Sequence, residues 1–509
     1  MPRLTLELDL NRVEGDLTFQ VEVEDGRVVE ARCVGTTYRG FEQIMIGRAP
    51  RDALVITPRI CGICSTAHLY AATLALEDAW GIAPPGNAIQ IRNATLMAEV
   101  IQSDLRQTFL FFAPDFCHER YADSPARAAV VDAFAPFQGW AHRETLRYSR
   151  RIIEIVALLA GQWPHSSHMT PGGVTAEATA RKIVDGQSLV TEVTRWVEQR
   201  LLGGDLEEWL ALSDADALSE WLATRPATAL ALLDQAARFA GLDAIGSGSP
   251  LMLAFGAFPL AEPTANRSHW LTPGVWRGGD RPVVPLEPAR IDEHVRYSWF
   301  RPYPGGKHPL AGETVPDYQP ASDRYSWAKA PRYGNEVMQT GPLADLLVDG
   351  DPLIRSLHRR AGGNAWLRQL ARLRRMTHLL RFLRQTFDQL AARRHEPHIM
   401  LLPDGIEQDG RGAGLLTAAR GALGHWISIR DGAFNRYQVI TPTSWNASPR
   451  DSAGTPGHWE QSLIGVPVRD PDDPLEIAHV IRSHDPCLVC TVHFLDAGRQ
   501  TGRRVRLGV

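Results

Sequence analysis

The chain has few cysteines and no long apolar run, and each of these shortages excludes a class of protein. Only six cysteines occur among its 509 residues, too few for a disulfide scaffold of this size. No apolar stretch reaches the roughly 18 residues that a membrane-spanning helix needs. Residues 1–7 contain no signal-peptide core, so we expect the chain to fold in the cytoplasm and to leave it only as the passenger of an exported partner.

A strong charge of either sign is also missing. The formal net charge is -4 and the pI is near 6.5, so nothing in the overall balance attracts nucleic acid or a membrane surface. Hydrophobic residues make up 44% of the chain, which suffices for a sizeable core in two or three domains. The sequence therefore predicts a large globular protein whose function depends on local motifs.

The residues that carry chemistry form two Cys-x-x-Cys pairs near opposite ends of the chain. The first pair is Cys61 and Cys64, and the second is Cys487 and Cys490. Four thiolates in two tight pairs can hold a soft transition metal. Because almost the whole chain separates the pairs, the fold must bring its two ends together, and the metal would lie deep. Cys33 and Cys117 stand apart from the pairs, so we expect them to be small buried hydrophobes.

Three interpretations of four cysteines are open from the residues alone. A structural zinc site usually places its two pairs about 15–20 residues apart, far closer than here. A dithiol redox site needs only one pair. A catalytic soft-metal site needs four sulfurs, open coordination positions and surrounding polar groups, which Glu14, Arg59, His68, Arg420 and Asp485 could supply. These residues leave zinc and a catalytic metal as the main alternatives.

The two pairs and their flanks resemble the large subunit of nickel–iron hydrogenases. That family's first motif reads Arg-x-Cys-Gly-x-Cys with a His four residues on, and Arg59 to Cys64 with His68 reproduces it. Its last motif, Asp-Pro-Cys-x-x-Cys-x-x-His, runs here from Asp485 to His493. Further similar stretches spread the resemblance over nearly the whole chain: 12–15, 39–42, 164–165, 172–174, 325–333, 420–421 and 445–450.

The resemblance implies a set of metal ligands. All four thiolates of the two pairs would bind nickel, and Cys64 and Cys490 would also bridge to an iron that carries one carbon monoxide and two cyanides, Fe(CO)(CN)2. Glu42 and His493 would bind Mg2+. For Glu42 there is also a plainer interpretation, an ordinary glutamate at the start of a helix, where the helix dipole favours it.

The resemblance also implies how hydrogen is split. H2 would be cleaved heterolytically, Cys487 would take the proton and Glu14 would pass it outward. Arg420 would lie over the open position, and Thr443 would donate a hydrogen bond to a cyanide. His68 would donate to a bridging sulfur. The plainer alternatives are a surface carboxylate for Glu14 and a structural helix histidine for His68.

The predicted fold class is α+β and mainly helical, with a core of long helices and peripheral β-hairpins. Alternating apolar residues around Asp25-Gly26 and around Asp431-Gly432 predict two hairpins. The predicted parts of a large subunit spanning 1–493 are a hairpin at 3–34, a helical bundle at 66–202 and 352–394, an irregular α/β layer at 205–350 and a metal segment at 410–493. Residues 494–509 would be an extension removed by a maturation endopeptidase.

The helix predicted over 352–394 carries an apolar stripe and, on its other faces, many arginines. A solvated face, or ion pairs with a neighbouring acidic surface, is the commoner explanation of such arginines, and a nucleic-acid helix is the rarer one.

Three stretches depart from the family's usual pattern. Asp16 stands where a His is common, and Asp104 and Arg106 occupy a stretch where histidines are often found. Thr417-Ala418-Ala419 precedes Arg420, where many relatives have Glu-Ala-Pro. These changes leave the candidate ligands intact and alter the surroundings of Arg420.

The cysteine count also predicts a partner. Once four cysteines hold a metal, too few are left to bind iron–sulfur clusters, so electrons must leave through another chain. We therefore expect an iron–sulfur small subunit, maturation proteins and an endopeptidase as partners, no nucleic acid, and membrane contact only through partners. The expected function is H2 uptake, with a regulatory H2 sensor as the alternative. A respiratory-complex subunit would lack the four cysteines, and a zinc-stapled interaction protein would show no hydrogen chemistry.

Overall fold

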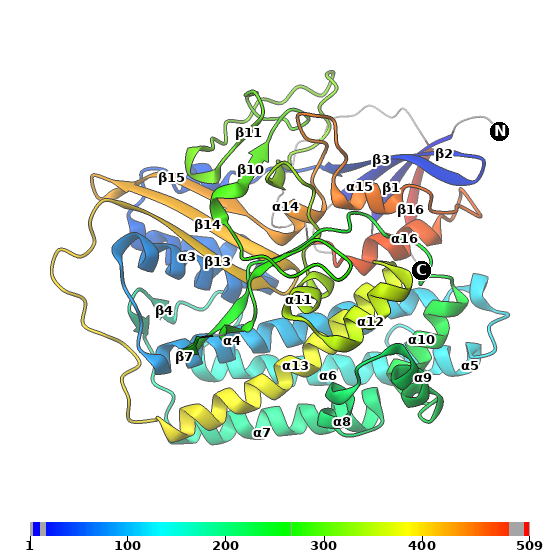
Figure 1. The fold of residues 1–509 in the computed structure, drawn as a ribbon, viewed down its shortest axis with the longest axis horizontal. Helices are drawn as coiled ribbons and strands as arrows, with labels where there is room; N and C mark the ends of the chain where they lie inside the picture. Colours follow the sequence, from blue (N-terminus) through cyan, green and yellow to red (C-terminus); the bar gives the residue numbers. More distant parts are fainter. Residues whose placement is uncertain (1–3, 11–16, 266, 488–502, 508–509) are drawn as a thin grey trace.

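The computed structural model describes residues 4–10, 17–265, 267–487 and 503–507. Its long helices form one layer, which the β-sheets cover along one side (Figure 1). The four longest are α4 (Gly86–Arg106), α6 (Trp140–Ala160), α7 (Ala180–Trp196) and α13 (Ala365–Ala392). Helix α4 packs against α6 and α13, and α7 packs against the same two helices. The predicted mainly helical α+β class is confirmed.

Helices α4 and α7 each continue into a π-helical turn. Gln107–Phe112 after α4 and Val197–Leu202 after α7 are π-helical turns. The helices of the bundle predicted over 66–202 are therefore present, and two of them have a changed hydrogen-bond pattern in their last turns. A 3-10 turn, Ala113–Cys117, follows the first of them.

The run predicted over 352–394 is two helices, α12 (Pro352–Ala361) and α13. Gly362 has a φ of 67° and ends α12, and the side chain of Asn364 accepts from the Leu367 N–H and caps α13. The expectation of a solvated face is wrong for four residues of α13, Arg368, Arg372, Arg374 and Arg375, whereas the expected ion pairs with acidic neighbours are formed by the last three. Each is at most 3% exposed, because neighbouring elements cover α13 on several sides.

The chain begins with a sheet in the strand order β16-β1-β2-β3. Strands β1 (Leu4–Leu10), β2 (Leu17–Glu24) and β3 (Arg27–Gly35) are antiparallel neighbours, and β16 (Arg503–Leu507) lies parallel to β1. The predicted turn at Asp25-Gly26 is confirmed, with φ values of 50° and 71°. The far end of the chain is thus paired with its beginning.

A second sheet consists of β13 (Gly410–Ala418), β14 (Gly421–Arg430) and β15 (Ala433–Ile440). It confirms the hairpin expected at Asp431-Gly432. Strand β13 lies directly on helix α3 (Ser65–Trp80). Glycines make this approach possible, because a Cβ on Gly412 would meet the carbonyl oxygen of Ala75 at 2.1 Å and one on Gly414 would meet that of Ala71 at 1.9 Å.

The layer predicted at 205–350 is helical in its first part and irregular after it. Three helices come first, α8 (Leu206–Ala211), α9 (Ala215–Ala223) and α10 (Ala229–Phe239). Short strands and one helix follow: β6 (Met252–Ala254), β7 (Ala257–Thr264), β8 (Arg267–Leu271), β9 (Gly274–Trp276), β10 (Ile291–His294), β11 (Gly306–Lys307), β12 (Ala330–Tyr333) and α11 (Pro342–Asp349).

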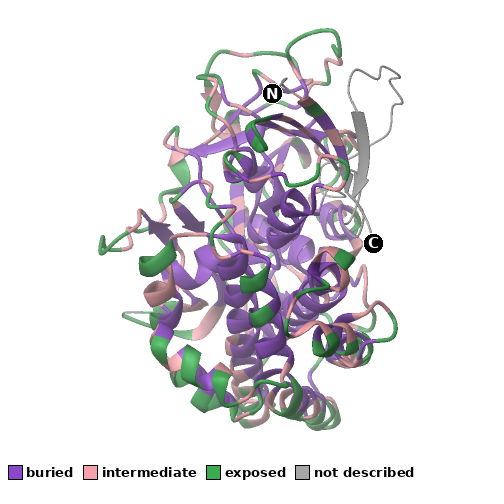
Figure 2. Ribbon diagram, turned by 90° about the vertical axis from the view of Figure 1, so that its right-hand side faces the viewer, coloured by how far each residue is buried: buried purple, intermediate pink, exposed green. Residues whose placement is uncertain are grey.

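The remaining elements are short. They are α1 (Phe41–Ile44), α2 (Ala53–Ile56), α5 (Arg127–Phe134), β4 (Met169–Thr170), β5 (Gly173–Val174), α14 (Pro442–Asn446), α15 (His458–Leu463) and α16 (Leu475–Ser483). Buried residues run continuously through the middle of the molecule, from the helical layer into the sheets (Figure 2). In the part of the chain that the structure describes, no single helix could cross a membrane by length and composition; one pair, bent by 118°, passes that test when joined, Pro50–Arg59 with Gly62–Trp80.

Candidate metal centre

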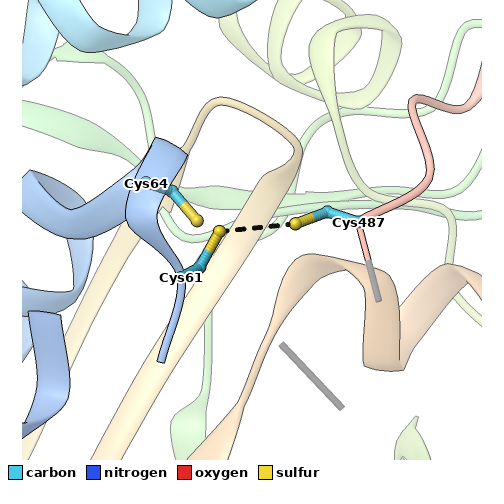
Figure 3. A group of neighbouring side chains, drawn as sticks. All are labelled: Cys61, Cys64 and Cys487. Atoms are coloured by element: carbon cyan, nitrogen blue, oxygen red, sulfur yellow. Dashed lines mark hydrogen bonds between the residues drawn. The ribbon is translucent and has the colours of Figure 1, made fainter. Parts of the chain in front are cut away.

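Three cysteines from the two ends of the chain meet in the interior (Figure 3). The Sγ atoms of Cys61 and Cys487 are 3.5 Å apart, and the sulfurs of Cys61, Cys64 and Cys487 all lie within 4.8 Å of one another. These three residues are 1%, 6% and 0% exposed. The prediction that the fold joins the two pairs is confirmed for these three thiols, while Cys490 lies outside the described residues.

The thiols come from two segments that meet in the interior, one at the start of α3 and one after α16. Cys64 ends a 3-10 turn, Gly62–Cys64, and occupies the residue just before the first turn of α3. Cys487 follows α16 after a sharp bend, in which Asp485 has a φ of 62°. A non-glycine residue in this left-handed region needs support from its surroundings, and Asp485 receives it through its side chain.

Arg420 links the sheet of β13 and β14 to the segment that carries Cys487. It lies in the two-residue turn between β13 and β14, where Ala418 pairs with Gly421. Its Nη2 is 3.0 Å from Oδ1 of Asp485, and its Nε donates to the carbonyl oxygen of Asp485 at 3.2 Å. Burial alone would lower the pKa of Arg420, but Asp485 and the thiols of Cys487, Cys64 and Cys61 raise it well above its usual value. Its buried Nη1 has no hydrogen-bond partner among the described residues.

His68 lies in the first turns of α3 and belongs to a chain of three buried side chains. Its Nδ1 is 3.1 Å from Nε2 of His425 on β14, and Nδ1 of His425 is 2.9 Å from the hydroxyl of Tyr437 on β15. Burial lowers the pKa of His68 to about 3 although Cys487 lies close enough to raise it, and burial also depresses the pKa of His425. Both rings are therefore neutral, and each holds one N–H.

Glu42 lines a small, partly open cavity of about 80 Å³, and Ile60, the residue before Cys61, lines it too. Its carboxylate accepts from the Val439 N–H at 2.8 Å and from the Thr314 hydroxyl, and lies 3.5 Å from Lys329 Nζ. Lys329 also contacts Glu293 at 3.3 Å. Two carboxylates around a cavity are suitable ligands for a hard cation such as Mg2+, and Lys329 supplies positive charge beside them.

A further buried carboxyl group lies at the start of α3. Glu99 of α4 accepts from the backbone N–H groups of Thr66 and Ala67 at 2.9 and 3.1 Å, and from Nε1 of Trp163 at 3.2 Å. Burial raises the pKa of Glu99 to about 7 because those hydrogen bonds only partly offset the loss of water. The carboxyl group of Glu99, whose pKa burial raises to about 7, therefore contacts the first turn after Cys64.

The other residues singled out in the sequence differ in where they lie. Glu14, Cys490 and His493 lie outside the described residues. Thr443 is 3% exposed, in the first turn of α14. Arg59 is exposed at the surface, where it donates to the Val55 carbonyl, so the idea that it surrounds the metal is wrong. Cys33 is fully buried, as expected, and Cys117 is half-buried.

Sequence reasoning missed His425 and Tyr437 as part of the site. Every residue of β14 except its last is buried, so the strand has no alternation that would set His425 apart. A histidine in a mostly apolar run was the available signal, since buried polar groups need partners.

Comparison with known proteins agrees with this geometry. Residues 39–133 and 229–493 match a family described as nickel-dependent hydrogenase. The chain is 32% identical to the periplasmic [NiFeSe] hydrogenase large subunit of Desulfomicrobium baculatum, over 96% of this chain and 94% of that protein. It is 27% identical to the uptake hydrogenase large subunit of Rhodobacter capsulatus, over 96% and 94% of the two chains. The solved Ni-Fe-Se hydrogenase of D. vulgaris Hildenborough superposes with a TM-score of 0.81 at 31% identity, over 97% of this chain and 100% of that one.

The chain belongs to the family of nickel-dependent hydrogenases, and a buried trio of thiols on this fold is consistent with the metal site of that family. It is a hydrogenase large subunit, the catalytic one, and thus an oxidoreductase acting on H2. All four candidate ligand positions hold cysteine in this chain.

Proposed function

We propose that this subunit oxidises H2 and passes the electrons to an iron–sulfur small subunit. The observation that carries the proposal is the buried group of Cys61, Cys64 and Cys487, together with the nearby guanidinium of Arg420, whose Nη1 has no hydrogen-bond partner in the part of the chain that the structure describes. Three soft donors suit nickel, and a buried guanidinium nitrogen without a partner needs an acceptor on a bound group. A nickel–iron centre with one carbon monoxide and two cyanides satisfies both requirements.

When bound, this centre supplies the open, electron-rich metal position at which H2 is polarised. The chain's own residues then handle the proton. The sulfur of Cys487 accepts it, and Glu14 takes it onward, since a thiolate and a carboxylate within hydrogen-bond reach act as base and relay. Asp485 fixes one side of the Arg420 guanidinium at 3.0 Å, and Nη1 would donate to a group bound at the thiols. Thr443 would donate its hydroxyl to a cyanide.

The buried histidines set which nitrogen of His68 faces the site. If the Tyr437 hydroxyl donates to Nδ1 of His425, the His425 proton lies on Nε2 and is donated to Nδ1 of His68. His68 then keeps its proton on Nε2, where it can donate to a thiolate sulfur. The opposite order would place a lone pair against the negative charge, which is unfavourable. The chain of three side chains thus supports the proposed bond from His68 to a bridging sulfur.

A magnesium ion belongs to the proposal as well. Glu42 would bind it together with His493, and Glu293 and Lys329 would stabilise the surrounding water and charge. The cavity lined by Glu42 and Glu293 supports this assignment.

The iron–sulfur partner would dock over the segment that leads to the first cysteine pair. This segment exposes three large apolar side chains, Ile44, Ile46 and Val55, at 44%, 50% and 49%. Exposed apolar groups close together in the sequence are typical of an interface. A partner here would lie within a few residues of Cys61, which gives electrons a short way out. The two chains would form a heterodimer.

The extension 494–509 would be removed during maturation, leaving His493 as the last residue. The location of the finished enzyme, cytoplasmic, membrane-associated or periplasmic, would follow from its partner. The D. baculatum relative, named a periplasmic enzyme, is an example of one such location.

The test is an H2-dependent assay of the chain purified with its partner and with maturation proteins supplied. We expect reduction of an artificial electron acceptor by H2, abolished in Cys487→Ala and retained in Cys33→Ala. Cys33 is a suitable control because it is equally buried but lies outside the thiol group. Turnover too slow to feed metabolism, together with H2-dependent control of a signalling partner, would favour the sensor instead. Zinc at the thiols with no hydrogen chemistry would contradict both.

A further inference from the structure

Behind Arg420 lies a network of alternating charges from five elements. Its members are all at most 5% exposed: Arg372 and Arg375 of α13, Asp104 of α4, Asp345 of α11, Asp485 after α16 and Arg420 itself. Three arginines face three aspartates, so the network is neutral as a whole. An ion network is a poor way to stabilise a core, because apolar residues of the same volume do as well or better. Its presence here points to a need for fixed geometry.

Asp104 connects the two arginines of α13. Its Oδ1 accepts from Nη1 of Arg372 at 3.1 Å and from Nη2 of Arg375 at 2.7 Å, and its Oδ2 accepts from Nε of Arg375 at 3.1 Å. Arg372 and Arg375 are three residues apart and therefore lie on one face of the helix. One carboxylate from α4 thus holds both guanidinium groups at fixed positions.

Each of the two arginines holds one end of the Arg420–Asp485 pair. Nη1 of Arg372 lies 3.1 Å from Oδ2 of Asp485, the oxygen that Arg420 does not use. Nη2 of Arg375 donates to the carbonyl oxygen of Ala419 at 2.5 Å and so fixes the turn that carries Arg420. Nη1 of Arg375 also contacts Asp345 at 2.8 Å, whose other oxygen lies 3.4 Å from the Thr417 hydroxyl.

We propose that Asp104, through Arg372 and Arg375, is a positioning residue for the hydrogenase reaction and sets the place of the Arg420 guanidinium over the metal. The proposal rests on the proposed function of Arg420. The network joins the two stretches that differ from the family's usual pattern. Asp104 lies in one stretch, and Arg375 contacts it directly. In the other stretch, Arg375 donates to the backbone carbonyl of Ala419, and Asp345 accepts from the Thr417 hydroxyl.

The same helix provides a matched control. Nε of Arg374 lies 3.0 Å from Oδ2 of Asp351, and both residues are buried like Asp104 and Arg375. That pair connects to the carbonyls of Trp209 and Leu210 and does not contact Arg420 or Asp485. Removing either aspartate breaks a buried ion pair of α13, but only Asp104 belongs to the network behind Arg420.

The experiment compares wild type, Asp104→Asn and Asp351→Asn as holoenzymes with the partner. We expect both variants to lower the Tm. Only Asp104→Asn should shift the infrared bands of the carbon monoxide and cyanides and lower kcat, roughly tenfold to a hundredfold, as displaced catalytic groups do. Crystal structures of the same proteins should show the Arg420–Asp485 contact lengthened in Asp104→Asn alone. Unchanged bands, kcat and contact in Asp104→Asn would overturn the proposal.

Arg372→Lys provides a second variant that keeps the charge. Both contacts of Arg372 come from its Nη1. The side chain of lysine is shorter and ends in a tetrahedral ammonium, so its nitrogen cannot hold Asp104 and Asp485 in the same geometry. We expect the band shift and the lengthened contact here too, and a wild-type spectrum with a wild-type contact would overturn the proposal. A wild-type enzyme without nickel would instead contradict the proposed function, and the crystal structures would still show whether Asp104 positions Arg420.

Discussion

The guanidinium of Arg420 holds Asp485 at two points, through a 3.0 Å contact with its carboxylate and a 3.2 Å hydrogen bond to its carbonyl oxygen. One residue lies in a tight turn between strands, and the other lies two residues before Cys487, in a left-handed conformation. The contact therefore ties the sheet to the segment that delivers a metal-binding thiol. Nη1 of Arg420 is buried with no hydrogen-bond partner among the described residues, and the guanidinium as a whole interacts electrostatically with the three thiols, so a bound group could accept from Nη1.

Arg420→Lys should lower kcat for H2 oxidation about a hundredfold while nickel and iron content stay at the wild-type level. A lysine keeps the charge but cannot contact Asp485 twice and still direct a donor toward the thiols. Steady-state kinetics and elemental analysis on the same sample measure the two effects. Arg277→Lys is the control, since Arg277 pairs with Glu336 away from the thiols. An equal loss of kcat in both variants would contradict a role of Arg420 in the reaction.

Tyr437→Phe should remove the hydrogen bond that fixes the proton positions on His425 and His68, without removing a metal ligand. Without the Tyr437 hydroxyl, the proton of His425 can move to either nitrogen, and His68 loses its fixed donor toward the sulfur. We expect a roughly tenfold lower kcat, which corresponds to the roughly 1 kcal/mol that one hydrogen bond contributes. Tyr333→Phe, which removes another buried hydroxyl bonded to the Glu287 N–H, should leave kcat unchanged. A normal rate in Tyr437→Phe would show that His68 needs no such support.

Glu99 should make the protein less stable as the pH rises from about 4.5 to about 7. The pKa of Glu99 is raised to about 7 by burial, so in this window the folded chain binds a proton that the unfolded chain has lost. The stabilisation present at low pH, roughly 3 kcal/mol from the size of the shift, is lost as the pH passes the folded pKa. Denaturant unfolding at pH 5 and pH 7.5 measures it.

Glu99→Gln should reduce the difference between those two pH values, because glutamine does not titrate. The exposed Glu262 provides the matched variant, and Glu262→Gln should keep the wild-type difference. An unchanged pH dependence in Glu99→Gln would mean that other buried carboxyls, such as Glu293, dominate the window.

Removal of the C-terminal extension should uncover the edge of β1. Strand β16 lies in that extension and pairs with β1 from Leu6 to Leu10. Hydrogen exchange should therefore be slow in β1 of the precursor and faster in the mature chain, while β3, on the far edge of the sheet, stays constant. Mass spectrometry of active enzyme should show a chain that ends at His493. A longer chain in the active enzyme would contradict the proposed processing.

Much of the fold follows from short-range signals in the sequence. The Asp-Gly turns fixed two hairpins, and the spacing of apolar residues located the long helices. The spacing and flanks of the cysteine pairs were enough to predict that Cys61, Cys64 and Cys487 meet. The hairpins and helices depend on residues close together in the sequence. The meeting of the cysteines follows because one metal needs all its ligands in one place.

The charged interior could not be predicted in the same way. Arginines on α13 look solvated in sequence, because periodicity does not show how many sides of a helix other elements cover. Arg372 and Arg375 are buried by elements distant in the chain, and their acid, Asp104, comes from α4, 268 and 271 residues away. His425 was missed for the related reason that its strand is buried on both faces.

The most direct test of the account is the metal content of the enzyme purified with its partner from a host that supplies the maturation proteins. The account predicts one nickel for each large subunit and one iron beyond the iron of the partner's clusters. It also predicts that both are lost when Cys61, Cys64 or Cys487 is replaced by alanine, while Cys33→Ala keeps them. Zinc in place of nickel, in an enzyme that takes up no H2 after reduction, would contradict it.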